Sequence, residues 1–175
     1  YKMMTPESTK WTPEFALEVA DRFMKDLAIP AIGKEVTKEY DLDFTELMNA
    51  TNVELEQYLV MFGGYRAYLE NQVADTTAIK TALDASFNES FYTAIYKLAE
   101  ERESLGLKKL TKDELRGAAL LKYERLKTLR QDVITQEAIH IRLSGLLNAY
   151  KATYDAVSRI VTLRNIGRES SKGVY

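Results

Sequence analysis

The single histidine of the chain, His140, follows Glu137 by three residues, and this spacing places both side chains on one face of a helix. Helical bundles that bind two metal ions use such a Glu-x-x-His pair twice, because the ligands come from several helices. With one histidine and no cysteine, one copy of the chain lacks the second half of that site and any thiolate ligand. The pair therefore predicts a polar layer that sets the register of a heptad seam, with no metal and no cofactor.

The residue types of nucleophilic catalysis are also missing. A catalytic triad needs a histidine beside an activated serine or cysteine, and no serine here stands in a glycine-rich elbow. Gly63 and Gly64 have neither the spacing nor the following Lys-Ser/Thr of a phosphate-binding loop. We expect a protein without enzymatic activity.

Basic residues give the pattern with the clearest chemical meaning. On one continuous helix, five cations would fall within a sector of about 60°, with Tyr123 between them. These cations are Lys109, Lys112, Arg116, Lys127 and Arg130. Cations that meet phosphates, beside a ring on which a base can stack, are what single-stranded DNA requires. The alternatives are a solvated helix face, or a face that pairs with residues 1–100, which carry 9 Lys+Arg against 17 Asp+Glu.

An apolar stripe near the end of the chain continues into arginines. It consists of Leu143, Leu147, Tyr150, Tyr154, Val157 and Val161. The next two positions of the series are Arg164 and Arg168, and Arg159 lies elsewhere on the same helix. Because an unpaired buried charge is costly, the seam is expected to open there, so that the three arginines bind phosphates. The alternative is a frayed helix end, where arginine is favoured by the helix dipole.

Start and stop signals predict three main helices. An amphipathic helix begins at Pro13, with Thr12 as its N-cap. Two brief helical turns follow over 31–40 and 41–50. The second turn begins with a capping box formed by Asp43 and Glu46. Residues 1–50 thus form a small helical lobe.

Residues 51–175 are predicted to form a long antiparallel helical hairpin, coiled-coil-like, so the fold class is all-α. Its first helix starts at the capping box Thr51–Glu54 and ends before Gly106. Arg66, Thr76 and Lys80 interrupt its apolar series, and Gly63-Gly64 predicts a kink or close packing. Its second helix starts at the capping box Thr111–Glu114 and runs unbroken over about 112–168.

Two long helices in one hairpin have too little mutual contact to bury every apolar position, which predicts a homo-oligomer held by the stripe from Leu143 to Val161. No apolar run reaches the roughly 20 residues of a membrane span, and the first residues lack the apolar core of a signal peptide. We therefore expect no membrane contact and a cytoplasmic location, in the host cell if a phage encodes the chain.

Residues 52–169 resemble the phage recombination mediators of the UvsY type. The first long helix of that family is similar to ELEQYLVMFGGYRAYLENQVADTTAIKTAL, and the second to RQDVITQEAIHIRLSGLLNAYKATYDAVSRIVTLRNIGRE. The resemblance implies an oligomer that binds single-stranded DNA, helps load a RecA-like recombinase, and contacts that recombinase and a single-strand-binding protein. The alternative function is a structural or assembly protein, such as a virion component or coiled-coil scaffold, whose charges pair with protein.

Overall fold

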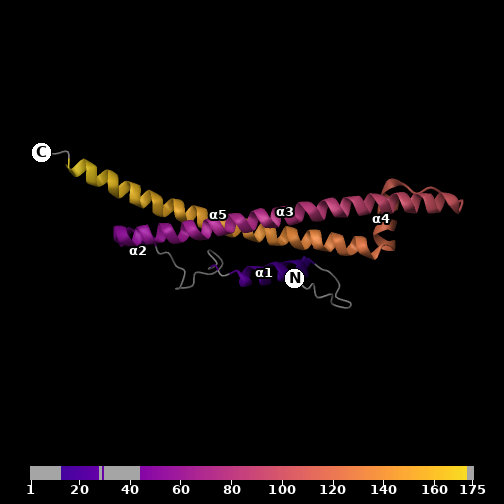
Figure 1. Cartoon of the computed structure of the whole chain (residues 1–175), viewed down its shortest axis with the longest axis horizontal. Helices are drawn as coiled ribbons and strands as arrows, with labels where there is room; N and C mark the ends of the chain where they lie inside the picture. The colour runs from indigo at the N-terminus through magenta and orange to yellow at the C-terminus, as the bar shows by residue number, and fades with distance from the viewer. Residues whose placement is uncertain (1–12, 28, 30–43, 173–175) are drawn as a thin grey trace. The chain divides into compact units, whose positions relative to one another are not determined.

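The computed structural model describes residues 13–27, 29 and 44–172, and all regular secondary structure within these ranges is helical (Figure 1). The helices are α1 (Pro13–Asp26), α2 (Phe44–Asn49), α3 (Asn52–Ser104), α4 (Lys112–Lys122) and α5 (Glu124–Lys172). α3 and α5 pack against each other, which confirms the all-α helical hairpin. The predicted N-cap Thr12, the turn over 31–40 and the capping contacts of Asp43 with Glu46 lie outside the described residues.

Two of the predicted capping boxes are present. At the start of α3, the Thr51 amide donates to the Glu54 carboxylate at 2.6 Å, and the Glu54 amide donates to the Thr51 hydroxyl at 3.3 Å. Thr111 and Glu114 make the same reciprocal pair before α4, at 2.8 and 3.3 Å. Each box satisfies amide groups that a helix N-terminus would otherwise leave without an acceptor. Gly106, with φ of 64°, allows the turn that follows the end of α3 and precedes α4.

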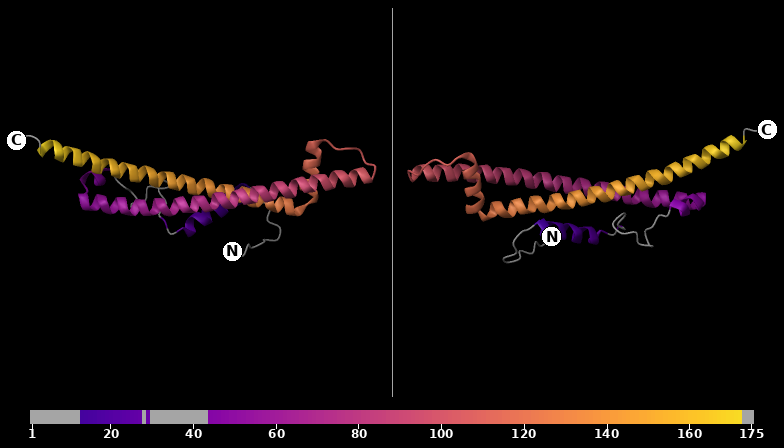
Figure 2. Two further views of the ribbon diagram at one scale, coloured as in Figure 1. Left: turned by 45° about the horizontal axis from the view of Figure 1, so that its top comes forward. Right: turned by 180° about the vertical axis from the view of Figure 1, so that it is seen from behind.

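The predicted second long helix is interrupted, because α4 and α5 are separated at Tyr123. This residue is extended, with φ −107° and ψ 100°, although its amide still donates to the Ala119 carbonyl at 3.0 Å. Its ring packs on a cluster made by α3, α4 and α5 in which Leu98, Ala119 and Leu126 are buried. Figure 2 shows α4 turned out of the direction of α5. Tertiary packing thus breaks a stretch that contains neither glycine nor proline near the break.

The chain divides into two units, and the division differs from the predicted boundary at residue 50. Unit 1 comprises residues 1–24 with 75–140, and unit 2 comprises 25–74 with 141–175. Each unit therefore contains one part of α3 and one part of α5. The N-terminal 50 residues are shared between the units, because α1 falls mainly in unit 1 and α2 in unit 2.

The core of unit 2 is built from large side chains. Tyr150 of α5 is 1% exposed, and its ring lies 6.0 Å from that of Phe62 and 5.4 Å, edge-on, from that of Tyr65, both on α3. Leu55, Leu69, Leu143 and Val157 are also fully buried there. A Cβ on Gly63 would lie 3.6 Å from the Tyr154 ring, an ordinary van der Waals distance, and a Cβ on Gly64 would meet open space. α3 continues through the glycine pair, and close packing does not require glycine at either position.

The core of unit 1 is built largely from small side chains. Its buried members near the hairpin turn are Ala94, Leu98, Ala119 and Leu126. The partly buried residues packed on them include Phe91, Ile95, Leu115 and Tyr123. α1 adds the buried Ala16 and Ala20 to the chain's buried residues. Small side chains allow helices to approach closely but bury less apolar area per residue.

Candidate nucleic-acid interface

The polar residues that interrupt the α3 series each meet a partner on α5. In unit 2, the Arg66 guanidinium lies 5.8 Å from the centre of the Tyr154 ring and pairs with Glu70 of its own helix at 3.2 Å. Glu70 also accepts from Lys151 of α5 at 3.2 Å. These contacts lower the pKa of the Glu70 carboxyl, first through the hydrogen bond from Arg66. Arg66 thus occupies a seam position without an uncompensated buried charge.

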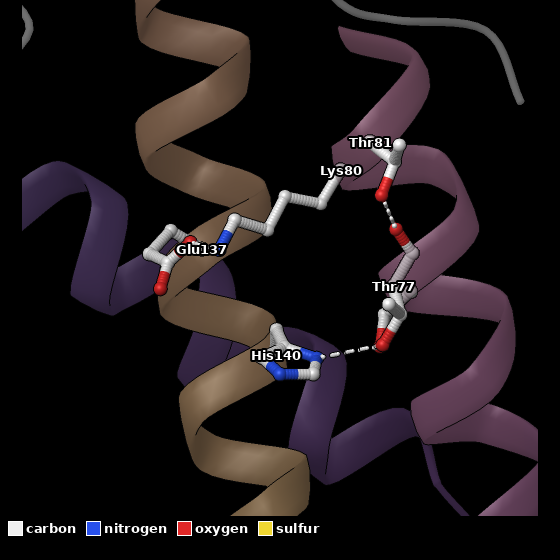
Figure 3. A network of polar contacts seen from close by, with 6 residues as sticks. Thr77, Lys80, Thr81, Glu137 and His140 are labelled. Carbon is white, nitrogen blue, oxygen red and sulfur yellow. Dashed lines mark hydrogen bonds and ion pairs between the residues drawn. The ribbon is translucent and has the colours of Figure 1, made fainter. Parts of the chain in front are cut away.

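The Glu137–His140 pair forms a polar layer in unit 1 (Figure 3). His140 Nδ1 lies 3.5 Å from the hydroxyl of Thr76, which is 4% exposed, and 3.4 Å from that of Thr77. Glu137 forms an ion pair with Lys80, and this contact raises the pKa of the lysine. Both members of the Glu-x-x-His pair therefore face α3, as a register-setting layer requires.

Within the described ranges, no three His, Asp or Glu side chains gather as metal ligands would. None of the helices in those ranges combines the length and the apolar character of a membrane span.

The stripe assigned to oligomerisation is covered within one chain. Leu143, Leu147, Tyr150 and Val157 are buried, and Tyr154 and Val161 are partly buried. They face the aromatic and aliphatic side chains of α3, so they need no second copy to leave water. This corrects the role given to these six residues, and a homo-oligomer would have to use another surface.

Arg164 does not lie in an open seam. Its guanidinium donates to the carbonyls of Ala50 at 2.5 Å and Met48 at 2.6 Å, and to the Asn52 side chain at 3.3 Å. A longer contact of 3.5 Å reaches the Leu47 carbonyl. Carbonyls at a helix C-terminus lack amide partners and carry partial negative charge, so the guanidinium caps α2. The prediction that Arg164 binds phosphate is corrected accordingly.

The five cations predicted for one helix face are not on one helix. Lys109 precedes α4, Lys112 and Arg116 belong to α4, and Lys127 and Arg130 belong to α5 beyond the break. Three of these cations form ion pairs with carboxylates a few residues away in the chain. The N···O distances are 3.6 Å for Lys109 with Glu103, 3.7 Å for Arg116 with Asp113 and 2.8 Å for Lys127 with Glu124. Exposed pairs of this kind add little stability, but a neighbouring carboxylate offsets the attraction of the cation for phosphate, so these three cations should contribute less to phosphate binding than unpaired ones.

Tyr123 is a core residue rather than an exposed ring. It is partly buried on the cluster of Ala94, Leu98, Ala119 and Leu126, and Lys122 lies 5.6 Å from its ring centre. Its predicted role as a stacking platform is corrected for this reason. Among the described residues of unit 1, the exposed rings are on α3, where Tyr92 is 53% and Tyr96 75% exposed. The sequence signal was their spacing of four residues outside the apolar series.

The exposed cations of the predicted set lie on α4 and α5 or, in one case, just before α4. They are Lys109, which precedes α4, and Lys112, Arg130, Arg159 and Arg168. Arg125, which the sector of predicted cations left out, is exposed as well. α5 carries nine Lys and Arg against five Asp and Glu, whereas α3 carries four against nine. The positive surface therefore follows α5.

Comparison with known protein families, curated proteins and solved structures finds no match to this chain.

Proposed function

We propose that this chain is a non-enzymatic protein that binds single-stranded DNA through the exposed cations of α4 and α5. The observation that carries the proposal is that Arg125, Arg130 and Arg159 of α5 are exposed in a hairpin whose other long helix is acidic. Of the α5 cations, Lys151 is engaged by α3 through Glu70. Exposed guanidinium groups attract phosphates regardless of base sequence, which suits a binder without sequence preference.

The biological role proposed for this binding is recombination mediation. The resemblance of residues 52–169 to the UvsY-type mediators supports a role in loading a RecA-like recombinase. It also supports the recombinase and a single-strand-binding protein as partners and self-association of the chain. Each of these points depends on the resemblance and adds to the proposed DNA binding.

Fluorescence anisotropy with a labelled oligo(dT), measured over a series of salt concentrations, tests the DNA binding. Replacing Arg125, Arg130 and Arg159 together by Gln should weaken binding and reduce the salt slope by about 2, at roughly 0.7 per lost phosphate contact. The matched control replaces Arg116, Lys127 and Lys151 by Gln, which removes the same charge from side chains that pair with carboxylates. It should change the slope much less.

Equal slopes in the two triple variants would mean that only net charge matters and would contradict a site on α5. No binding of the unmodified protein at low salt would contradict the proposal altogether. The second candidate, an assembly or scaffold protein, would then be preferred. It is favoured by large apolar side chains on the surface, among them Val60 at 78% and Leu163 at 69% exposed.

A further inference from the structure

The outer face of α3 in unit 2 carries no charged residue over several turns. Its members recur at steps of three and four and are all exposed: Val53, Gln57, Val60, Gly64, Ala67 and Asn71. Val53 is 64% exposed and Val60 even more so. A helix face that meets only water usually carries Glu, Lys or Arg. This face instead has the composition of a helix that contacts another helix.

The same face has a shape that can receive side chains. Val53, Glu56, Gln57, Val60 and Met61 line a shallow, open hollow on its surface. One turn further, Gly64 has no atom within 4 Å of the place where a Cβ would stand. A second helix can therefore place side chains against the valines and bring its backbone close at the glycine.

α5 presents a matching face in the same unit. Ile141, Gly145, Asn148 and Ala152 are exposed, uncharged and spaced by steps of three and four. Ile141 is 59% exposed, and Gly145, like Gly64, has open space where a Cβ would stand. The face ends where charge returns, at Asp155 and Arg159. Each of the two faces thus combines an exposed aliphatic side chain with a glycine at which another backbone can come close.

Charge decides which faces can meet. Residues 52–74 of α3 carry one Lys or Arg against three Asp or Glu, and residues 141–172 of α5 carry six against two. Two α3 faces would bring like charges together, as would two α5 faces, whereas an α3 face and an α5 face attract each other.

We propose that copies of this chain associate head to tail, with the α5 face from Ile141 to Ala152 of one copy on the α3 face from Val53 to Asn71 of the next. Such a heterologous contact leaves one free face at each end, so it extends until the copies close into a ring or form a filament. The inference deepens the self-association in the proposed function. It needs no nucleic acid, so it can fail while DNA binding stands, and the reverse.

Sedimentation of the whole chain without nucleic acid tests this contact. The unmodified protein should exceed the 20.0 kDa of one chain. Val60→Glu places a charge in the α3 face, and Ala152→Glu places one in the α5 face. Each variant alone should therefore sediment as a monomer. Ser86→Glu adds the same charge at an exposed α3 position in unit 1 and should leave the assembly unchanged.

Mixing the two variants distinguishes the head-to-tail contact from a symmetric one. In an equimolar mixture, the intact α5 face of Val60→Glu can dock on the intact α3 face of Ala152→Glu, so a dimer of twice the chain mass should form and grow no further. A mixture that stays monomeric, or an Ala152→Glu variant that assembles normally, would overturn the proposal. A monomeric unmodified protein would overturn it as well. Circular dichroism should show that both variants keep the helicity of the unmodified chain, since Val60 and Ala152 are exposed.

Discussion

Unit 2 is held by interlocking aromatic and large aliphatic side chains, whereas unit 1 is held by alanines, a few leucines and a polar layer. Both units contain parts of α3 and α5, while α4 and most of α1 belong to unit 1 and α2 belongs to unit 2. Buried rings remove more apolar area from water than buried methyl groups do. The free energy of unfolding should therefore be concentrated in unit 2, and amide hydrogens of unit 1 should exchange first.

Removal of the central ring of unit 2 should have the largest effect. Tyr150→Ala leaves a cavity between Phe62 and Tyr65 and should lower the free energy of unfolding by about 4 kcal/mol. Leu98→Ala in unit 1 removes a side chain that is already 8% exposed and should lower it by about 2 kcal/mol. Denaturant titration checks both values. Equal losses in the two variants would refute the comparison.

The next largest effect concerns the cap of α2. Arg164→Gln removes a charged donor from the Met48 and Ala50 carbonyls and should lower the stability of unit 2 by about 2 kcal/mol. Because this arginine is used by α2, the salt slope of oligonucleotide binding should stay within error of the unmodified protein. Hydrogen exchange should show faster exchange in α2 and the first turn of α3. A reduced slope with unchanged stability would restore the phosphate-binding role of Arg164.

Equivalent caps allow a matched test of the two units. Thr51→Ala in unit 2 and Thr111→Ala in unit 1 should each lower stability by about 1 kcal/mol. In both boxes the pKa of the glutamate is lowered from its ordinary value of 4.5, chiefly by the threonine amide. The contribution of the carboxylates is therefore present above pH 4.5 and is lost as the pH falls through their lowered pKa values. Glu54→Gln should remove this acid dependence for α3, which titration by circular dichroism measures.

The smallest effect should come from a carboxyl group in unit 1. Burial raises the pKa of Asp132 above its ordinary value of 3.8, so the folded state disfavours its charged form. Asp132→Asn should then stabilise the protein at neutral pH, by less than about 0.5 kcal/mol because solvent screens this partly exposed side chain. The gain should vanish as the pH falls and the aspartate becomes protonated in both states. A loss of stability at neutral pH would reveal a favourable contact of the carboxylate.

Local signals in the sequence predicted what depends on neighbouring residues. The capping boxes at Thr51 and Thr111, the turn at Gly106 and the spacing of the seam are all properties of a few residues along the chain. The structure confirms these features. They could be predicted because a helix start or an apolar stripe is determined mainly by neighbouring residues in the chain. The polar layer at His140 could also be predicted, because a single histidine at a heptad position cannot complete a metal site within one chain and is instead expected to bond to the facing helix.

Features that depend on distant packing could not be predicted in the same way. Nothing within a few residues of Tyr123 signals a break, which comes from packing α4 on the end of α3. Arg164 looked like an exposed cation because its acceptors lie more than 110 residues earlier in the chain. The stripe was correctly identified as apolar, but the α3 rings that cover it were not matched to it. The sequence shows which residues are charged or apolar, but it does not show which distant residues they contact.

The cap on α2 also sets an order of events during synthesis. Ala50 and Arg164 are 114 residues apart, so the carbonyls at the end of α2 leave the ribosome long before the side chain that receives them. At about 5–20 residues per second, this interval lasts on the order of 10 seconds. Until α5 is complete, α2 has no guanidinium at its C-terminus, and a helix of six residues is unstable alone. α2 is therefore translated early but is fixed only after Arg164 has been added.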